Sequence, residues 1–244
     1  MSGHSKWSNI KHKKEKTDAQ KAKVFTKIGK EMAIAIREGG PEPTSNSKLR
    51  DLIAKAKSLN VPNDNIERII KKASGDDGAV YEEIVYEGYG PSGVAVIVKT
   101  STDNRNRTAG EIRHYFDKYN GNLGMSGCVS YMFTDKGIII VDKEDGPDED
   151  QLMEDALEAG AEDFAADGDV FEITTLPEDL TAVREALEGK GYTIASAEPD
   201  KIPSTYVTLT DEEAIKMMNN LLEHLEDNDD VLEVYHNWEM PDEE

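Results

Sequence analysis

The chain has 244 residues, a formal net charge of -22, and hydrophobic and aromatic fractions of 37% and 7%. This length predicts one to three domains, and the composition is typical of a globular protein with a modest core and a large charged surface. It contains no run near the ~20 apolar residues that cross a bilayer, and no apolar segment follows the basic amino terminus to make a signal peptide. The single cysteine, Cys128, excludes an internal disulfide framework and favours a cytoplasmic location.

Charge is divided unevenly along the chain. Residues 1–75 hold 17 Lys and Arg against 8 Asp and Glu, whereas residues 133–244 hold 6 against 34. Such asymmetry indicates a basic segment that binds a polyanion, joined to an acidic body. Two interpretations of the acidic part are open. It confers solubility alone, or it also repels nucleic acid from the wrong face of the protein.

The most basic stretch runs from Gly3 to Lys30 and contains nine lysines and two histidines. Lysines displace counterions from a phosphate backbone, and an aromatic ring placed among them can stack on a base. The alternative is a solvated amino-terminal arm without a partner. The candidate nucleic-acid-binding residues of this stretch are His4, Lys6, Trp7, Lys11, His12, Lys13, Lys14, Lys16, Lys23, Lys27 and Lys30.

Three helices are predicted in the basic segment. Thr17 and Gln20 have capping-box spacing before a helix over 18–38, in which an apolar stripe lies opposite three of the candidate lysines. Apolar residues at helical spacing predict two more helices over 47–60 and 63–73. No helix shows the Asn, Gln or Arg pattern that reads bases, so backbone contacts are expected rather than sequence-specific readout.

Beyond a polar break at 74–78 the hydrophobic period changes to two, and helices then alternate with strands. This order predicts an α+β protein with small, largely antiparallel sheets. Residues 135–137 are expected to form a turn, and Thr210 with Glu213 a capping box for the last helix. The predicted strands are 80–86, 94–100, 129–133, 138–141, 170–174, 192–195, 206–209 and 231–235, and the predicted helices are 148–159, 177–188 and 211–227.

Arg105 and Arg107 form a second candidate site. Thr108 and Glu111 have capping-box spacing, which places both arginines just before a helix amino terminus. Free backbone N–H groups and the helix dipole favour an anion there, and two guanidinium groups could clamp a phosphate or a carboxylate. The alternative is a pair of structural salt bridges to the acidic body.

Catalysis finds little support in the sequence. The five histidines and Cys128 show no metal-ligand spacing, and no phosphate-cradling or dinucleotide-binding motif is present. A cysteine–histidine pair is the only conceivable nucleophilic arrangement, and a structural role for Cys128 is the better interpretation. We expect a non-enzymatic binding protein without metal or cofactor.

Several blocks of sequence resemble the YebC family, including GHSKWSNIKHKK, YEGYG, NRNRTAGEIRH, NLG, IPST and EVYHN. The resemblance extends to about residue 237 and implies a three-domain α/β protein in which one domain is inserted into another. With the polar break, it gives a basic three-helix domain at 1–75, an α/β domain at 79–133 plus 205–244, and an inserted acidic α/β domain at 134–204.

The resemblance implies a probable DNA-binding transcriptional regulator. Some members of the family are described as translation factors that act on ribosomes, for example where proline runs stall synthesis. The residues leave DNA and RNA open as partners, because lysine-to-phosphate contacts carry little base information. We expect a cytoplasmic protein that binds nucleic acid and no membrane, and a basic protein is a candidate partner for the acidic domains.

Overall fold

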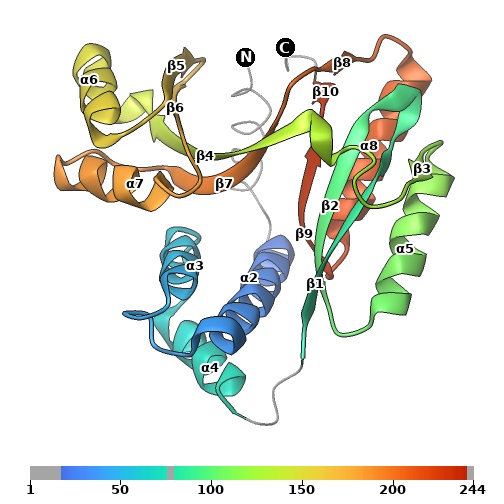
Figure 1. The fold of residues 1–244 in the computed structure, drawn as a ribbon, viewed down its shortest axis with the longest axis horizontal. Helices are drawn as coiled ribbons and strands as arrows, with labels where there is room; N and C mark the ends of the chain where they lie inside the picture. Colours follow the sequence, from blue (N-terminus) through green and yellow to red (C-terminus); the bar gives the residue numbers. More distant parts are fainter. Residues whose placement is uncertain (1–17, 76–79, 241–244) are drawn as a thin grey trace. The chain divides into compact units, whose positions relative to one another are not determined.

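The computed structural model describes residues 18–75 and 80–240 (Figure 1). These residues form two compact units. One is residues 134–202, and the other combines the preceding part of the chain with residues 203–240. Below, residues 18–75 are called the helical segment, and residues 80–133 with 203–240 the sheet body. The predicted division into three domains stays a prediction, because the helical segment and the sheet body belong to the same compact unit.

The helical segment consists of α2 (Asp18–Gly39), α3 (Ser47–Ser58) and α4 (Asn63–Ala73), which confirms the three predicted helices. One buried side chain, Asn46, joins the first two. Its Oδ1 accepts from the N–H of Leu49 and caps α3, while its Nδ2 donates to the carbonyl groups of Ala35 and Gly40. The apolar stripes of the helices pack against each other in one core, which includes Ile28, Met32, Leu49, Ala56 and Ile66.

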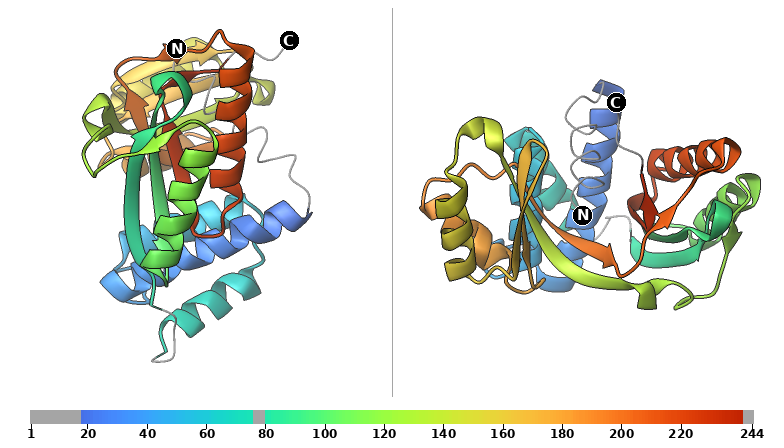
Figure 2. Two further views of the ribbon diagram at one scale, coloured as in Figure 1. Left: turned by 90° about the vertical axis from the view of Figure 1, so that its right-hand side faces the viewer. Right: turned by 90° about the horizontal axis from the view of Figure 1, so that it is seen from above.

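The sheet body is built on a four-stranded sheet with the order β3-β1-β2-β9 and antiparallel pairing throughout. Its helices α5 and α8 lie along the same face of the sheet (Figure 2). Their buried residues, such as Ile112, Phe116 and Leu221, pack with Val96 and Val98 of the sheet. The elements are β1 (Glu82–Tyr89), β2 (Ala95–Thr102), α5 (Arg105–Lys118), β3 (Asn122–Leu123), α8 (Glu212–Asp227) and β9 (Val231–His236), with a short parallel pair, β8 (Val207–Thr208) and β10 (Trp238–Glu239).

The unit at 134–202 holds a second four-stranded sheet, with the order β5-β6-β4-β7. Its helices α6 and α7 contribute Leu152 and Val183 to a core that also contains Ile139, Phe171 and Ile173 from the strands. The elements are β4 (Phe133–Asp142), α6 (Glu149–Ala159), β5 (Asp163–Asp167), β6 (Val170–Thr175), α7 (Leu180–Gly189) and β7 (Ser196–Pro203). The α+β class with antiparallel sheets is therefore confirmed.

Two strand predictions and one turn prediction were wrong. Residues 130–132 form a 3₁₀ turn instead of a strand, and the expected turn at 135–137 lies inside β4. The strand expected at 192–195 begins only at Ser196, and β5 was not predicted. Both strands lie at sheet edges, where the alternation of apolar residues is weak and a proline such as Pro199 is tolerated.

Candidate nucleic-acid interface

The candidate residues fall into two groups. Lys23, Lys27 and Lys30 lie on α2 and are called the lysine face below. Arg105 and Arg107 lie in the first turn of α5. The remaining candidates lie outside the described residues: His4, Lys6, Trp7, Lys11, His12, Lys13, Lys14 and Lys16.

The lysine face contacts residues 226–230, which comprise the end of α8 and its link to β9 and are called the acidic segment below. Lys23 Nζ lies 2.9 Å from Asp227 Oδ1, and its charge lowers the pKa of that carboxyl group through this hydrogen bond. Lys27 Nζ donates to the Glu226 carbonyl oxygen at 2.6 Å. Within the described part of the chain, all three lysines of this face thus meet oxygen atoms of the acidic segment.

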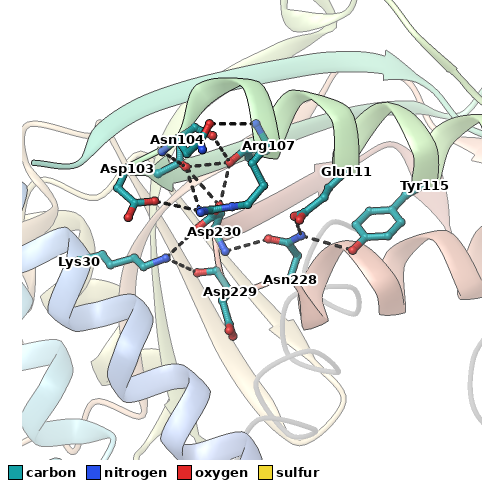
Figure 3. Close-up of polar contacts among 11 residues, drawn as sticks. Lys30, Asp103, Asn104, Arg107, Glu111, Tyr115, Asn228, Asp229 and Asp230 are labelled. Carbon is teal, nitrogen blue, oxygen red and sulfur yellow. Dashed lines mark hydrogen bonds and ion pairs between the residues drawn. The ribbon is translucent and has the colours of Figure 1, made fainter. Parts of the chain in front are cut away.

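Lys30 reaches the most buried carboxylate of that segment. Its Nζ donates to Asp230 Oδ1 and to the Asp229 carbonyl oxygen, both at 2.8 Å (Figure 3). The side chains of Lys30 and Asp230 are only 12% and 7% exposed. This ion pair is therefore shielded from solvent, unlike the one between Lys23 and Asp227, whose side chains are 39% and 66% exposed.

Asp230 is held by four side chains. Besides Lys30, its carboxylate accepts from Arg107 at 2.6 Å (Figure 3). It also accepts from Thr108 at 2.8 Å and from Thr102 at 3.2 Å. Burial alone raises the pKa of this carboxyl group. The hydrogen bonds from Arg107, Lys30 and Thr108 outweigh burial, and the net effect lowers the pKa of Asp230 from 3.8 to about 2.

The arginine site differs from its prediction in detail. Asn104 is the cap residue of α5, because its Oδ1 accepts from the N–H of Arg107 at 3.1 Å, so the arginines belong to the first helical turn. Thr108, predicted to cap the helix, is buried and donates to Asp230 instead. The anion held at this helix start is the chain's own carboxylate.

The two arginines have different surroundings. The Arg107 guanidinium pairs with Asp230 and with Asp103, and these contacts raise its pKa further above the ordinary value. Arg105 is 66% exposed, and its Nε lies 3.7 Å from a carboxylate oxygen of Glu82. Arg107 thus forms structural salt bridges, which is the alternative to an external anion, and Arg105 remains accessible.

Further ion pairs join the helical segment to the sheet body. Lys55 lies 3.3 Å from Glu233, and Lys48 lies 3.6 Å from Glu83. In each of these pairs, and in those of the lysine face, the cation belongs to the helical segment and the anion to the sheet body. The described residues form no hydrophobic cluster that draws on both parts, and ion pairs and hydrogen bonds connect the two.

Other cations of the helical segment face solvent. They are exposed, and none forms an ion pair with another described residue. Most lie on α3 and α4 and not on the lysine face that the sequence singled out. These cations are Arg37, Arg50, Lys57, Arg68, Lys71 and Lys72.

Two buried carboxylates that hold the structure together, Asp230 and Glu87, were not identified from the sequence. The Glu87 carboxylate is buried and accepts from the backbone N–H groups of Gly127, Val129 and Ser130 at 2.8–2.9 Å. Burial raises its pKa, but these hydrogen bonds outweigh burial and lower it. No pattern marks either residue, because each carboxylate is paired across a long sequence separation.

Three further features of the described residues concern the cysteine, metal binding and membrane spans. Burial, and to a lesser degree the charge of Glu87, raise the pKa of the Cys128 thiol, which disfavours the nucleophilic thiolate. Among the residues described, no three His, Cys, Asp or Glu side chains are grouped so as to hold a metal ion. None of the described helices has the length and apolar character of a bilayer span.

Comparison with known proteins identifies the family. Residues 5–76 match the family model described as "TACO1/YebC protein N-terminal domain", and residues 81–238 match "TACO1/YebC second and third domain". A protein of Acetivibrio thermocellus named "Probable transcriptional regulatory protein" is 62% identical over 98% of this chain and 99% of its own. A protein of Caldicellulosiruptor bescii with the same name is 59% identical over the full length of both chains.

A solved structure extends the comparison to the fold. The crystal structure of a conserved hypothetical protein, Aq1575 from Aquifex aeolicus, matches with a TM-score of 0.84 and 48% identity. The match covers 93% of this chain and 94% of that one. The curated relatives carry the name of regulatory proteins and not of enzymes. On the two family models and these identities, the chain belongs to the TACO1/YebC family.

Proposed function

We propose that this protein is a non-enzymatic regulator of gene expression that binds nucleic acid through its basic amino-terminal part. The observation that carries the proposal is the charge partition, in which residues 1–75 hold 17 basic against 8 acidic residues in a protein of net charge -22. The name that these relatives carry supports a role in regulating transcription. Duplex DNA is accordingly the first candidate partner.

The exposed cations of the helical segment support this assignment. Arg68, Lys71 and Lys72 recur at three and four residues on α4, so they share one face of that helix. They are not used in ion pairs with other described residues and are therefore available to phosphates. We expect them to bind phosphates in addition to the lysines between His4 and Lys16, and independently of the lysine face.

The second candidate is an RNA- or ribosome-associated translation factor. The observation that favours it is the choice of cation, since 14 of the 17 basic residues at 1–75 are lysines. Lysine binds phosphate as a point charge, whereas arginine pairs with bases and phosphates through a planar fork. A lysine-rich surface positions a protein on a backbone of either kind and does not select a promoter.

The proposal also covers the domain organisation and the location of the protein. It assigns the binding of nucleic acid to a domain at 1–75. The other proposed domains are 79–133 with 205–244 and the acidic insertion at 134–204. It places the protein in the cytoplasm, where its partner resides. A basic protein is the proposed partner of the acidic domains.

The experiment measures binding of the full chain to a mixed-sequence DNA duplex and to a mixed-sequence RNA strand. A first variant changes five lysines to glutamine, and a control variant makes the same charge change outside residues 1–75. We expect the first variant to lose most of its affinity for nucleic acid and the control to retain it. Equal losses of affinity would show that binding depends on net charge alone and would overturn the proposal. The first variant carries Lys6, Lys11, Lys13, Lys14 and Lys16→Gln, and the control Lys118, Lys136, Lys143, Lys201 and Lys216→Gln.

Two further measurements separate the candidates. A transcriptional regulator should prefer its promoter over random duplex by about 10³ or more at one salt concentration. A translation factor should show almost no such preference and should sediment with ribosomes until the salt concentration is raised.

A further inference from the structure

We propose that the lysine face of α2 is an additional phosphate-binding surface, covered here by the chain's own acidic segment, and that nucleic acid displaces this segment. The inference rests on the proposed function and adds to it a site and a means of regulation. In the present structure the acidic segment occupies the positions that phosphate oxygens would take.

The first argument is the chemistry of the contact. Lys23, Lys27 and Lys30 recur at four and three residues, so their side chains lie on one side of α2. They bind two carboxylates and several backbone carbonyl oxygens of the acidic segment at 2.6–3.3 Å. A lysine ammonium group donates to phosphate oxygens at the same range of distances, so one surface suits both ligands.

The second argument is that the contact can separate without loss of an apolar core. The helical segment has its own hydrophobic core, and the sheet body has others. The contacts that join them include ion pairs, three of which involve side chains that are 21–66% exposed. Exposed ion pairs are weak and are screened by salt, so an array of phosphates can compete with them.

The third argument concerns the buried carboxylate. When Lys30 leaves, Asp230 keeps Arg107, Thr108 and Thr102 as donors, all of which belong to the sheet body. Lys30 in turn gains a phosphate. Separation therefore leaves neither charge without a partner, which removes the main cost of opening a buried ion pair.

The test uses a carbodiimide, which joins a lysine amine to a carboxylate within an ion pair and creates an amide bond. The full-length protein is treated with and without a mixed-sequence DNA duplex or RNA strand, and cross-linked peptides are quantified by mass spectrometry. The pairs that report on the contact are Lys23–Asp227 at 2.9 Å and Lys55–Glu233 at 3.3 Å. The internal control is Lys136–Glu162 at 2.6 Å, within the unit at 134–202.

We expect saturating nucleic acid to reduce the two reporting cross-links at least severalfold and to leave the control unchanged. If nucleic acid binds and all three cross-links persist, the inference is overturned while the proposed function stands. If the full chain binds neither the duplex nor the strand, both fail together.

A pair of charge-matched variants provides an independent test. Asp227→Asn with Glu233→Gln removes two anions of the contact, whereas Asp117→Asn with Glu223→Gln removes two exposed anions elsewhere in the sheet body. The first variant should bind nucleic acid about threefold more tightly than the second, since each exposed pair accounts for less than about a fivefold change. Equal affinities would overturn the inference.

Discussion

The strongest prediction concerns Asp230. Asp230→Asn keeps the shape of the side chain but removes the negative charge that Lys30 and Arg107 share. The matched control is Asp229→Asn, because the Asp229 side chain is exposed and only its backbone carbonyl accepts from Lys30. The two substitutions are adjacent and change the net charge equally, so any difference reports the buried contact.

The expected magnitude follows from the pKa of the carboxyl group. A fall from 3.8 to about 2 corresponds to about 2.5 kcal/mol of stability at neutral pH. Breaking a buried ion pair by removing one partner costs ~3–5 kcal/mol, and Arg107 retains Asp103, which places this case at the low end. We therefore expect Asp230→Asn to lower the free energy of unfolding by about 3 kcal/mol and Asp229→Asn to change it by less than about 0.5 kcal/mol.

Urea unfolding followed by tryptophan fluorescence measures this difference. Trp238 is 1% exposed and lies in the core of the sheet body, so in a Trp7→Phe background it is the only reporter. If Asp230→Asn and Asp229→Asn have the same urea midpoint, the reasoning is refuted, because the carboxylate would then contribute no more than an exposed one.

The dependence of stability on acidic pH provides a second test of the same carboxylate. Its pKa is lower in the folded state than in the unfolded state, so its contribution is complete above about pH 4 and is lost as the pH falls towards about 2. The stability difference between the wild type and Asp230→Asn should therefore shrink over this window. A difference that stays constant down to about pH 2 would contradict the assignment.

Three further predictions concern single side chains. Arg107→Gln should lower the free energy of unfolding by about 1–3 kcal/mol, since a buried carboxylate loses a donor, whereas the exposed Arg105→Gln should change it by less than about 0.5 kcal/mol in the same urea titration. Glu87→Gln should cost about 2 kcal/mol and speed hydrogen exchange of the backbone amides that the carboxylate binds; unchanged exchange would count against it. Burial and the hydrogen bond to Asp155 raise the pKa of Tyr192 to about 12, and Asp155→Asn should lower it in an ultraviolet titration, while an unchanged value would leave burial as the only cause.

Local periodicity predicted most of the helices. The helix at 63–73 has the bounds that the sequence indicated, because its apolar residues, such as Ile66 and Ile70, pack against neighbours close in the chain. Cap residues were harder to place. Asp211 accepts from the Ala214 N–H and caps α8, although Thr210 has the capping-box spacing. Adjacent residues with similar capping ability are not separated by spacing alone.

The site could be predicted only in part. The acidic segment contains four carboxylates in five residues, and nothing in its composition marks the buried one. Asp230 is buried because β9 pairs with β2, which brings its backbone carbonyl to the Ser101 N–H and its carboxylate to Thr102. Likewise, helical spacing predicts that the lysine face is polar but not whether solvent, a phosphate or a carboxylate covers it.

Salt dependence connects these charges to binding. If about six amino-terminal lysines contact phosphates, the log–log salt slope is near -5 on duplex DNA and near -4 on a single strand. Salt also weakens the contact between the lysine face and the acidic segment, so it raises the fraction of protein that is open to nucleic acid. The two effects oppose each other, which makes the wild-type slope shallower than the number of phosphate contacts implies.

Removal of the opposing effect should restore the steeper slope. In the Asp227→Asn, Glu233→Gln variant, the lysine face is open to nucleic acid in a larger fraction of the protein at every salt concentration. The affinity of this variant should therefore fall more steeply with salt than that of the wild type. The charge-matched Asp117→Asn with Glu223→Gln variant should keep the wild-type slope. Equal slopes in all three proteins would mean that the acidic segment does not compete with nucleic acid. The basic residues at 1–75 would then interact with the external partner without regulation by the acidic segment.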